Sequence, residues 1–443
     1  MRSDLADMYG QDKLPRYTSY PTAPYFSSAI GEKVYRHWLR SVSAHRPVSL
    51  YVHIPFCRSM CWYCGCHTSV TKQDAPIAVF VAALRREAQL VADTIKKSLP
   101  VANLHFGGGT PTIMTPELFV DLADAFRYAF FVLPDAEIAV EVDPRTLTND
   151  LTQALEYCGV TRASLGVQSF DPRVQRAINR LQSFEQTAAA VERLRRVGVR
   201  GINFDLLYGL PFQTVSCCLD TIAKCVELRP DRFSVFGYAH VPSFKKHQRK
   251  IAEESLPDSV ERHVQSETIA EALQDAGYVR IGLDHFALPD DALATAQREG
   301  RLRRNFQGHT DDSADTLIGL GASAIGRMPQ GFVQNVVAMR DYLDRIAGGR
   351  FATVKGYAFT EDIERIMCDL TVDLEQISRI HDRDPRTAVV DRARIDRLLA
   401  DGVATMSQGR LTVSEGSEFL VRSVASAFDA HLPRSTGVHS RAV

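Results

Sequence analysis

The stretch SLYVHIPFCRSMCWYCGC, residues 49–66, places a short apolar run directly before four of the nine cysteines in the chain. The aromatic and branched aliphatic side chains of residues 49–54 predict a strand, so the cysteines lie in the loop that follows it. Cys57, Cys61 and Cys64 form a C-x3-C-x2-C triplet, and Cys66 follows after one further residue. Four thiols so close together predict a metal site.

Two kinds of metal centre use thiol ligands at short spacing. The triplet could hold three irons of a cubic [4Fe–4S] cluster and leave the fourth iron open to a ligand from outside the protein. A structural zinc site needs four protein ligands, usually in two halves, and no second half appears downstream, although His53 and His67 flank the loop. The spacing favours the open cluster over zinc.

Disulfide bonds are the other common use of clustered cysteines. Nine is an odd number, and the chain begins with MRSDLAD, which lacks the apolar core of a secretory signal. We therefore expect reduced thiols and a cytoplasmic protein.

The composition is that of an ordinary globular chain. Its 443 residues allow two or three domains, and the formal net charge is −1, with 24% charged and 45% hydrophobic residues. This balance lacks the basic excess that nucleic-acid binding needs. The longest apolar stretches, such as residues 78–84, are interrupted by charge well before the length of a membrane span. We expect neither a nucleic-acid partner nor a transmembrane helix.

From residue 49 to about residue 241, short β-type runs alternate with longer segments of helical periodicity. This alternation is typical of βα units that build a parallel sheet. Leu84, Ala88 and Val91 illustrate a helix face that would pack on the sheet, and Thr115 with Pro116 predicts the start of the next helix. Six strands are expected, at residues 49–54, 101–106, 137–141, 162–167, 201–206 and 232–236.

The unusual residues of this region all come directly after predicted strands. In parallel α/β barrels the carboxyl ends of the strands form one rim, and the loops at that rim build the active site. We therefore expect six loops to converge on one site. After the cysteine loop these are Gly107-Gly108-Gly109-Thr110-Pro111, Glu141-Val142-Asp143-Pro144, Gly166-Val167-Gln168-Ser169, Asn203-Phe204-Asp205-Leu206 and Phe236-Gly237-Tyr238-Ala239-His240.

Each of these residues also has a purely structural interpretation. The three glycines could form a tight turn, and they lack the G-x-G-x-x-G spacing of a dinucleotide site. Glu141 and Asp205, flanked by apolar residues, could each form an internal salt bridge. Gln168 could satisfy backbone groups at a strand end, and Arg180 could be a solvated residue at a helix start. Their occurrence together at corresponding strand ends favours ligand binding for the set.

The two ends of the chain differ from the central region. An arm, residues 1–45, is rich in aromatic side chains, and we hypothesise that it folds back as a cover over the site. After about residue 360, a helix at 392–399, a hairpin of 402–405 with 410–413, and a helix at 417–430 resemble a winged helix. No basic stripe accompanies this shape, so DNA binding is not expected.

The predicted fold class is α/β. It consists of a partial (β/α)6 barrel with an N-terminal arm and a mainly helical, winged-helix-like C-terminal domain. The predicted boundaries are 1–45 for the arm, 46–290 for the barrel, 291–359 for a barrel extension and connection, and 360–443 for the C-terminal domain.

Longer motifs accompany the cysteine loop along almost the whole chain. They are PRYTSYPT (15–22), YVHIPFC (51–57), HFGGGTP (105–111), EVDP (141–144), GVQ (166–168), YGLP (208–211), DHFA (284–287), AQREG (296–300) and NFQG (305–308). Together they resemble the radical S-adenosylmethionine (SAM) enzymes, and within them the oxygen-independent coproporphyrinogen III oxidases.

The resemblance implies one [4Fe–4S] cluster and two SAM molecules. Cys57, Cys61 and Cys64 would ligate the cluster, and the first SAM would chelate the fourth iron. Cys66 matches a cysteine that is needed for activity without ligating the cluster. The positions that match contacts of the first SAM are Tyr51, Gly107, Glu141 and Ile325. Those that match contacts of the second are Tyr63, which is Phe in other members, and Gly108, Gly109, Gln168, Arg180, Asp205 and Ala239.

The same resemblance implies a reaction and its partners. A 5′-deoxyadenosyl radical would start the oxidative decarboxylation of two propionates of coproporphyrinogen III to vinyl groups, giving protoporphyrinogen IX. The partners would be this substrate and an electron donor such as flavodoxin or ferredoxin, and the enzyme would be a monomer. Because the substrate carries four carboxylates, Arg or Lys should line its pocket, and Arg16 and Arg58 are candidates.

Two related functions compete with this interpretation. Haem chaperones share the C-x3-C-x2-C loop, but they lack the cysteine at position 66 and the Arg16-Tyr17-Thr18 segment. An anaerobic haem-degrading methyltransferase would also use SAM. Cys66 favours the decarboxylating oxidase over the chaperone.

Overall fold

The fold is described from a computed structural model that covers residues 3–10, 12–15, 17, 20–358, 371–374, 389–429, 431–432 and 440–441. All six predicted strands form in one sheet, where they lie side by side and pair with one another in parallel. Their bounds are β2 Val48–Ile54, β5 Pro100–Gly108, β6 Phe131–Val142, β7 Arg162–Gln168, β8 Gly201–Tyr208 and β9 Arg232–Gly237. The prediction of a partial barrel of six βα units is confirmed.

Strand β6 begins earlier than predicted. Phe131 and Val132 already pair with β5, and the register then shifts before pairing resumes at Glu137, the predicted first residue. Pro134 lies in the interval and has no N–H to donate to a neighbouring strand. The predicted strand therefore matches the regular part from Glu137 onward and lacks the earlier part that begins at Phe131.

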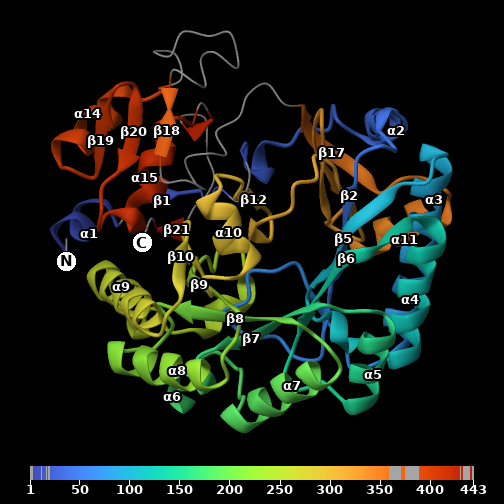
Figure 1. Cartoon of the computed structure of the whole chain (residues 1–443), viewed down its shortest axis with the longest axis horizontal. Coiled ribbons are helices and arrows are strands. Elements are labelled where there is room, and N and C mark those ends of the chain that lie inside the picture. Colours follow the sequence, from blue (N-terminus) through green and yellow to red (C-terminus); the bar gives the residue numbers. More distant parts are fainter. Residues whose placement is uncertain are drawn as a thin grey trace.

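Helices cover the outer face of the sheet, as Figure 1 shows. Thr115 caps the helix that was predicted to start there by accepting a hydrogen bond from the Leu118 N–H, and Pro116 is its first residue. The side chains of Leu84, Ala88 and Val91 are buried in the main core between helices and sheet. The helices of this layer are α3 Ala75–Ile95, α4 Pro116–Ala129, α5 Asn149–Tyr157, α6 Pro172–Ala177, α7 Phe184–Arg196, α8 Val215–Glu227 and α9 Ser259–Asp275.

The sheet continues beyond the six predicted strands on both sides. In the described residues it has twelve strands, in the order β10-β11-β9-β8-β7-β6-β5-β2-β14-β15-β16-β17. The added strands on one side are β10 Val279–Ile281 and β11 His285–Ala287, and those on the other are β14 Leu317–Leu320, β15 Ile325–Met328, β16 Gly331–Asn335 and β17 Thr353–Ala358. The segment predicted as a barrel extension and connection supplies four strands to the sheet, one of them parallel to β2.

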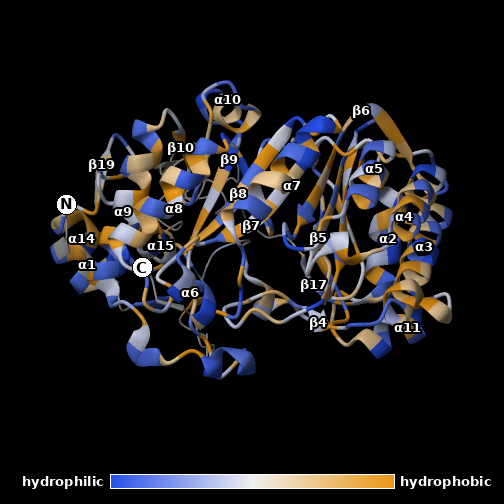
Figure 2. Ribbon diagram, turned by 90° about the horizontal axis from the view of Figure 1, so that it is seen from below, coloured by the Kyte–Doolittle hydropathy of each residue, from blue (hydrophilic) through white to orange (hydrophobic). Residues whose placement is uncertain are grey.

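Shorter elements complete this part of the chain. Helices α10 Ala292–Arg298 and α11 Met339–Ala347 and the hairpin of β12 Arg303–Asn305 with β13 Gly308–Thr310 lie between the added strands in sequence. Strands in Figure 2 are largely coloured as hydrophobic, whereas the helices carry hydrophilic residues interspersed with hydrophobic ones, as expected for helices packed on a sheet. None of the described helices combines the length and the apolar character needed to cross a membrane.

The N-terminal arm is divided between two cores. Helix α2, Glu32–Ser41, packs on the barrel core through Tyr35, Trp38 and Leu39. Helix α1, Ser3–Tyr9, lies beside the C-terminal elements (Figure 1), and Leu5 and Tyr9 are buried in their core. A division at residue 45 therefore does not match the packing.

The C-terminal region contains the predicted helix and hairpin. Helix α14, Arg392–Ala400, is followed by β19, Ala404–Ser407, and β20, Arg410–Val413, and β20 also pairs with β18, Thr371–Asp373. The predicted helix at 417–430 is instead a 3-10 turn, Glu418–Leu420, followed by the short α15, Val421–Ser426, and Ala430 lies outside the described residues. The Ser417 side chain makes no capping hydrogen bond that would start a longer helix there. Strand β1, Lys13–Leu14, pairs with β21, Ser440–Arg441.

Candidate functional site

The cysteine loop leaves β2 at the carboxyl end of the sheet. It begins at β3, Phe56–Cys57, and returns at β4, Ser69–Val70, which pairs with β3. The loop is held from the segment after α6: the Trp62 N–H donates to the Ile178 carbonyl at 2.9 Å, and Asn179 Nδ2 donates to the Met60 carbonyl at 2.8 Å. The thiols are thus carried by a loop that is fixed at its middle.

All four thiols line one small cavity of about 180 Å³. The other predicted site residues around it come from the cysteine loop itself, from the ends of four further strands and from the segment after α6. They are Tyr63, Gly108, Gly109, Glu141, Gln168, Arg180 and Asp205. The convergence of loops predicted from the strand ends is therefore observed, and the assignment of each residue to a particular SAM contact stays a prediction.

The cavity suits a cluster held by three thiolates. Thr110 Oγ1 and Thr68 Oγ1 lie 3.3 and 3.4 Å from Cys57 Sγ, and Arg180 Nη1 donates to Cys61 Sγ at 3.7 Å. Hydrogen bonds and positive charge beside the sulfurs stabilise an anionic thiolate-ligated group. Arg180 Nε is buried without a partner, so the wall also offers a free donor to a ligand.

The four thiols are not equivalent in acidity. A hydrogen bond with Cys66 lowers the pKa of the Cys64 thiol to about 7. The same hydrogen bond and the charge of Cys64 raise the pKa of Cys66. Burial raises the pKa of Cys57, against the hydrogen bonds from its two threonines. The shared proton stays with Cys66, which is consistent with Cys64 as the ligand of the two.

Glycine is required where the second strand meets the cysteine loop. A Cβ on Gly109 would lie 2.6 Å from the Phe56 carbonyl oxygen and from Thr68 Oγ1. Gly108 has a φ of +116°, and a Cβ there would lie 2.7 Å from His53 Cε1. The glycines therefore allow close packing of the cysteine loop, and Gly108 also turns its backbone toward the cavity.

Glu141 and Asp205 are two carboxylates without a strong ion pair in the described part of the chain. Glu141 accepts the Gly108 N–H at 3.0 Å and lies 3.5 Å from His105 Nε2. Asp205 accepts hydrogen bonds from Ser164 Oγ at 2.9 Å and Asn203 Nδ2 at 2.8 Å. Burial, followed by the charge of Glu141, raises the pKa of Asp205 to about 7. Such carboxylates are well placed for a cationic ligand group.

Gln168 and Arg180 occupy strained or buried positions. Gln168 has a φ of +67° at the end of β7, a conformation that costs energy in a non-glycine residue. Arg180 is buried: its Nη2 donates to the Gly166 carbonyl at 2.6 Å and lies 3.5 Å from Asp143 Oδ1. The interpretation of Arg180 as a solvated helix-start residue is therefore wrong.

A larger cavity of about 760 Å³ lies inside the partial barrel that the sheet forms. It shares Tyr63, Cys66, Glu141, Gln168 and Asp205 with the small cavity, so the two are neighbours with a common wall. Tyr51 and Ala239 line only the larger one, whereas Gly107 and Ile325 line neither. A Cβ on Gly107 would lie 2.6 Å from Glu141 Oε1 and 3.0 Å from Tyr51, so this glycine adjoins the site.

Arg58, one of the two predicted substrate-binding arginines, does not line the larger cavity. Arg58 forms an ion pair with Asp74 and lines a separate cavity of about 470 Å³ beside Thr110 and Met114. Arg16 lies outside the described residues. The cationic side chains that do line the larger cavity are Arg162, Arg232 and Lys245. Arg58 stays a predicted substrate contact, although it pairs with Asp74 and lines a different cavity.

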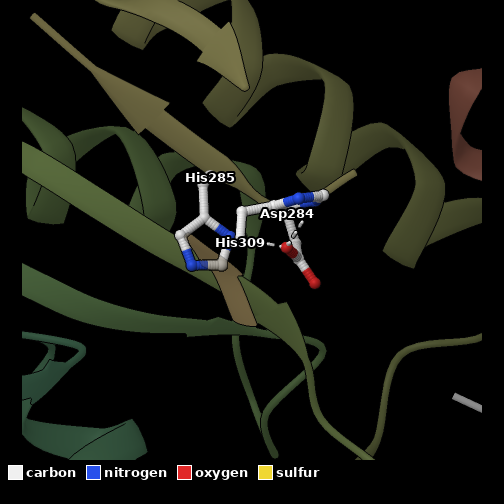
Figure 3. Close-up of side chains that lie close together, drawn as sticks. All are labelled: Asp284, His285 and His309. Atoms are coloured by element: carbon white, nitrogen blue, oxygen red, sulfur yellow. Dashed lines mark hydrogen bonds and ion pairs between the residues drawn. The ribbon is translucent and has the colours of Figure 1, made fainter. Parts of the chain in front are cut away.

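An aspartate and two histidines lie close together, and the two histidines line the larger cavity (Figure 3). Asp284 Oδ1 lies 2.6 Å from His285 Nδ1 and 3.7 Å from His309 Nε2. The spacing would suit a metal ion, but Arg304 donates to both Asp284 oxygens, at 3.1 and 2.8 Å, and the Leu283 N–H donates to His309 Nε2 at 3.2 Å. Although burial alone would raise it, Arg304 and His285 hold the pKa of Asp284 well below its usual range. We interpret the group as a buried charge network that fixes His285 in the cavity wall.

Sequence reasoning assigned no role to His53 or to this network. His53 is buried between Tyr51 and the cysteine loop, with Nδ1 3.0 Å from the Tyr51 hydroxyl and Nε2 3.0 Å from the His67 carbonyl oxygen. The DHFA motif was the available signal for Asp284 and His285. The contact between Arg304 and Asp284 depends on the fold. It makes the motif part of a buried charge network.

Comparison with known proteins places these features in one family. The model of the radical SAM superfamily matches residues 51–225. The oxygen-independent coproporphyrinogen III oxidase of Bradyrhizobium diazoefficiens is 58% identical over 450 residues, with 100% of each chain covered. The enzyme of the same name from Paracoccus denitrificans is 42% identical over 438 residues, with 97% of each chain covered. The solved structure of the Escherichia coli coproporphyrinogen III oxidase, described as a radical SAM enzyme, matches with a TM-score of 0.87 at 36% identity, and 95% of this chain and 100% of that chain are covered.

Proposed function

Because the chain belongs to the oxygen-independent coproporphyrinogen III oxidases of the radical SAM superfamily, we propose that it converts two propionates of coproporphyrinogen III to vinyl groups, giving protoporphyrinogen IX. The observation that carries this proposal is the pair of adjoining cavities, one lined by the four thiols and the other large enough for a tetrapyrrole. Cys66 lines both.

Cys57, Cys61 and Cys64 are the residues that would hold a [4Fe–4S] cluster, because their sulfurs line the small cavity with hydrogen-bond donors beside two of them. When bound, the cluster and SAM together supply a 5′-deoxyadenosyl radical, by one-electron cleavage of the sulfonium, that removes a hydrogen atom from the substrate. The protein positions the ligands and keeps water from the reacting atoms.

Two SAM molecules would need two sets of polar partners, and the site offers two carboxylates. Glu141, next to Tyr51 and Gly107, would take the amino group of the first SAM. Asp205 would take that of the second, with Arg180 Nε free to bind its carboxylate. Backbone groups close to both sets of polar partners belong to Gly108, Gly109 and Gln168. Ile325 stays a predicted contact of the first SAM, although it does not line either cavity.

The larger cavity would hold the porphyrinogen. Lys245 lines it and donates to the Cys66 carbonyl, and none of the described carboxylates forms an ion pair with it, so its other ammonium hydrogens would bind a propionate. Each vinyl group requires the loss of one hydrogen atom, one carbon dioxide and one electron from a propionate. Cys66 is exposed to both cavities, next to the predicted ligand Cys64, and we assign it to this step rather than to the cluster.

The proposal extends to the setting of the enzyme. A one-electron donor such as flavodoxin or ferredoxin would reduce the cluster, and the enzyme would work as a cytoplasmic monomer. The reduced thiols that the cluster needs support a reducing compartment.

A direct test separates this function from haem transport and haem degradation. Reconstituted protein is incubated without oxygen with coproporphyrinogen III, SAM and dithionite, and in parallel with haem. Divinyl product with release of carbon dioxide supports the proposal. Stable haem binding without such product would support the chaperone, and opening of the haem ring would support the methyltransferase.

A further inference from the structure

The loop that follows β9 is fastened to the cysteine loop. His247 Nε2 lies 2.7 Å from the Cys64 carbonyl oxygen, and Gln248 Nε2 donates to the Tyr63 carbonyl at 3.1 Å. Lys245 Nζ donates to the Cys66 carbonyl at 3.1 Å. Three successive contacts to backbone carbonyls therefore hold residues 245–248 directly over the predicted cluster ligands.

The same loop carries a concentration of exposed positive charge. Lys246, Arg249 and Lys250 are exposed, and we call these three residues the basic patch. In the described part of the chain no carboxylate forms an ion pair with any of them, although Glu253 and Glu254 follow in the sequence. Lys250 Nζ lies 5.4 Å from the centre of the Trp62 ring, within the cysteine loop. The three charges are therefore exposed to solvent, and that of Lys250 lies beside an aromatic ring of the cysteine loop.

The basic patch is distinct from the substrate cavity. Lys245 and Phe244 line the larger cavity, whereas Lys246, Arg249 and Lys250 line none of the three cavities described above. Phe244, which also lines that cavity, is 80% exposed and precedes the patch by two residues. A group of exposed cations suits a surface that receives an anionic protein partner, because opposite charges steer the two proteins together.

We propose that the basic patch is the docking surface for an acidic one-electron carrier protein. This inference rests on the proposed function, because a carrier is needed only if a cluster is reduced. The carrier would give up one electron and be oxidised by one electron, with no atom transferred, and the electron would be accepted in the cleavage of SAM. The hydrogen bond from His247 to the Cys64 carbonyl gives a short path from the patch to a predicted cluster ligand.

Binding of the carrier tests the inference without reference to turnover. The affinity of an acidic flavodoxin for the holoenzyme is measured at low and high ionic strength, for wild type and for the triple variant Lys246→Glu, Arg249→Glu, Lys250→Glu. We expect the affinity of the variant at low salt to fall roughly tenfold or more, and its salt dependence to disappear, because steering between opposite charges is screened by salt.

A matched control carries the same change in net charge elsewhere. Lys33 on α2, Arg86 on α3 and Arg200 directly before β8 are exposed, and none of them is near the cysteine loop in sequence. The variant Lys33→Glu, Arg86→Glu, Arg200→Glu should bind flavodoxin like wild type. Equal weakening by both triple variants, or no weakening by the first, would overturn the inference.

Turnover with two reductants separates the patch from the substrate site. With dithionite, which needs no docking surface, the basic-patch variant should keep wild-type kcat and KM for coproporphyrinogen III, whereas with reduced flavodoxin its rate should fall about as much as its affinity. A raised KM with dithionite would assign the patch to substrate carboxylates and overturn the inference. If the wild-type protein binds flavodoxin through the patch but does not turn over coproporphyrinogen III with dithionite, the proposed function is overturned instead.

Discussion

Cys64 and Cys66 are separated by one residue, yet the structure gives them different environments. Their mutual hydrogen bond favours the thiolate on Cys64 and the proton on Cys66. The Cys57→Ala variant should lose both the cluster and turnover, and Cys66→Ala should keep the cluster and lose turnover. Iron content and visible absorption report the cluster, and anaerobic product formation reports turnover. Bleached absorption in Cys66→Ala would show that the division of the four thiols into three ligands and one catalytic residue is wrong.

Gly109 offers a sharper test of how the cysteine loop is held. A Cβ at this position would meet the backbone of Phe56 at 2.6 Å, so Gly109→Ala should displace the start of the loop and lower the iron content after reconstitution. Gly65, in the same loop, has no atom within 4 Å of its added Cβ, so Gly65→Ala is the matched control and should reconstitute normally. Equal iron content in the two variants would contradict this account of the glycine.

The side chains that could be predicted from the sequence are those whose chemistry depends on local spacing. The cysteine triplet and the carboxylates after strands are of this kind, since a strand end fixes where the next residue lies. Arg58 and Asp284 depend on partners brought close by the fold, Asp74 in one case and Arg304 in the other. Such pairings carry no periodic signal, so the sequence did not reveal the ion pair of Arg58 with Asp74.

Among the secondary-structure elements, the six parallel strands were predictable and the added strands were not. Each parallel strand is followed by a helix of its own, which produces a repeating pattern over about 190 residues of sequence. The added strands, β10, β11 and β14 to β17, have three to six residues each. Some are joined to their neighbours in the sheet by short antiparallel connections, and others lie far from their sheet neighbours in sequence. Short runs of this kind do not distinguish a strand from a loop.

Glu87 joins helix α3 to these added elements and makes stability depend on pH. It accepts hydrogen bonds from the Gly321 N–H at 2.7 Å, Tyr342 Oη at 2.8 Å and Asn335 Nδ2 at 2.8 Å. Burial raises its pKa from 4.5 to about 7 despite these donors. Between those values the folded chain keeps a proton that the unfolded chain has lost, so the free energy of unfolding falls as the pH rises.

The Glu87→Gln variant should lack this fall. The difference in free energy of unfolding, variant minus wild type, should increase from pH 4.5 to pH 7 by an amount on the order of 3 kcal/mol. Denaturant unfolding of the metal-free chain at several pH values measures it. Glu192→Gln, at an exposed position on α7, is the control and should show a constant difference. A constant difference for Glu87→Gln would mean that Glu87 titrates near its ordinary pKa.

Over the whole chain, the two ends form one core apart from the barrel. Leu5 and Tyr9 pack among Leu398, Val421 and other C-terminal side chains, and the Tyr17 hydroxyl donates to Asp429 at 3.0 Å. The sequence could not reveal this contact, because no local pattern links segments almost 400 residues apart. The hypothesis that the arm covers the site therefore concerns a segment whose described residues line neither of the two cavities.

Removal of residues 1–15 tests both aspects of the arm. Each large apolar side chain lost from the C-terminal core costs about 2 kcal/mol of burial, so this core should melt at a lower temperature than the barrel, as a separate calorimetric transition. Leu5→Ala should shift that transition in the same direction by a smaller amount. If the arm also covers the site, the truncated enzyme should cleave SAM without matching product. An unchanged melting temperature of the C-terminal core would contradict the packing of the arm in that core. An unchanged ratio of product formed to SAM cleaved would exclude the arm as a cover of the site.

The central claim is that the thiol cavity and the tetrapyrrole-sized cavity serve one reaction. The most direct measurement is the anaerobic conversion of coproporphyrinogen III labelled with carbon-13 in its propionate carboxyls, with carbon dioxide, 5′-deoxyadenosine and vinyl product counted together. We predict two labelled carbon dioxide molecules per divinyl product, with 5′-deoxyadenosine formed, and none of these products from the Cys57→Ala variant. Cleavage of SAM by the wild-type enzyme without labelled carbon dioxide or vinyl groups would contradict the claim.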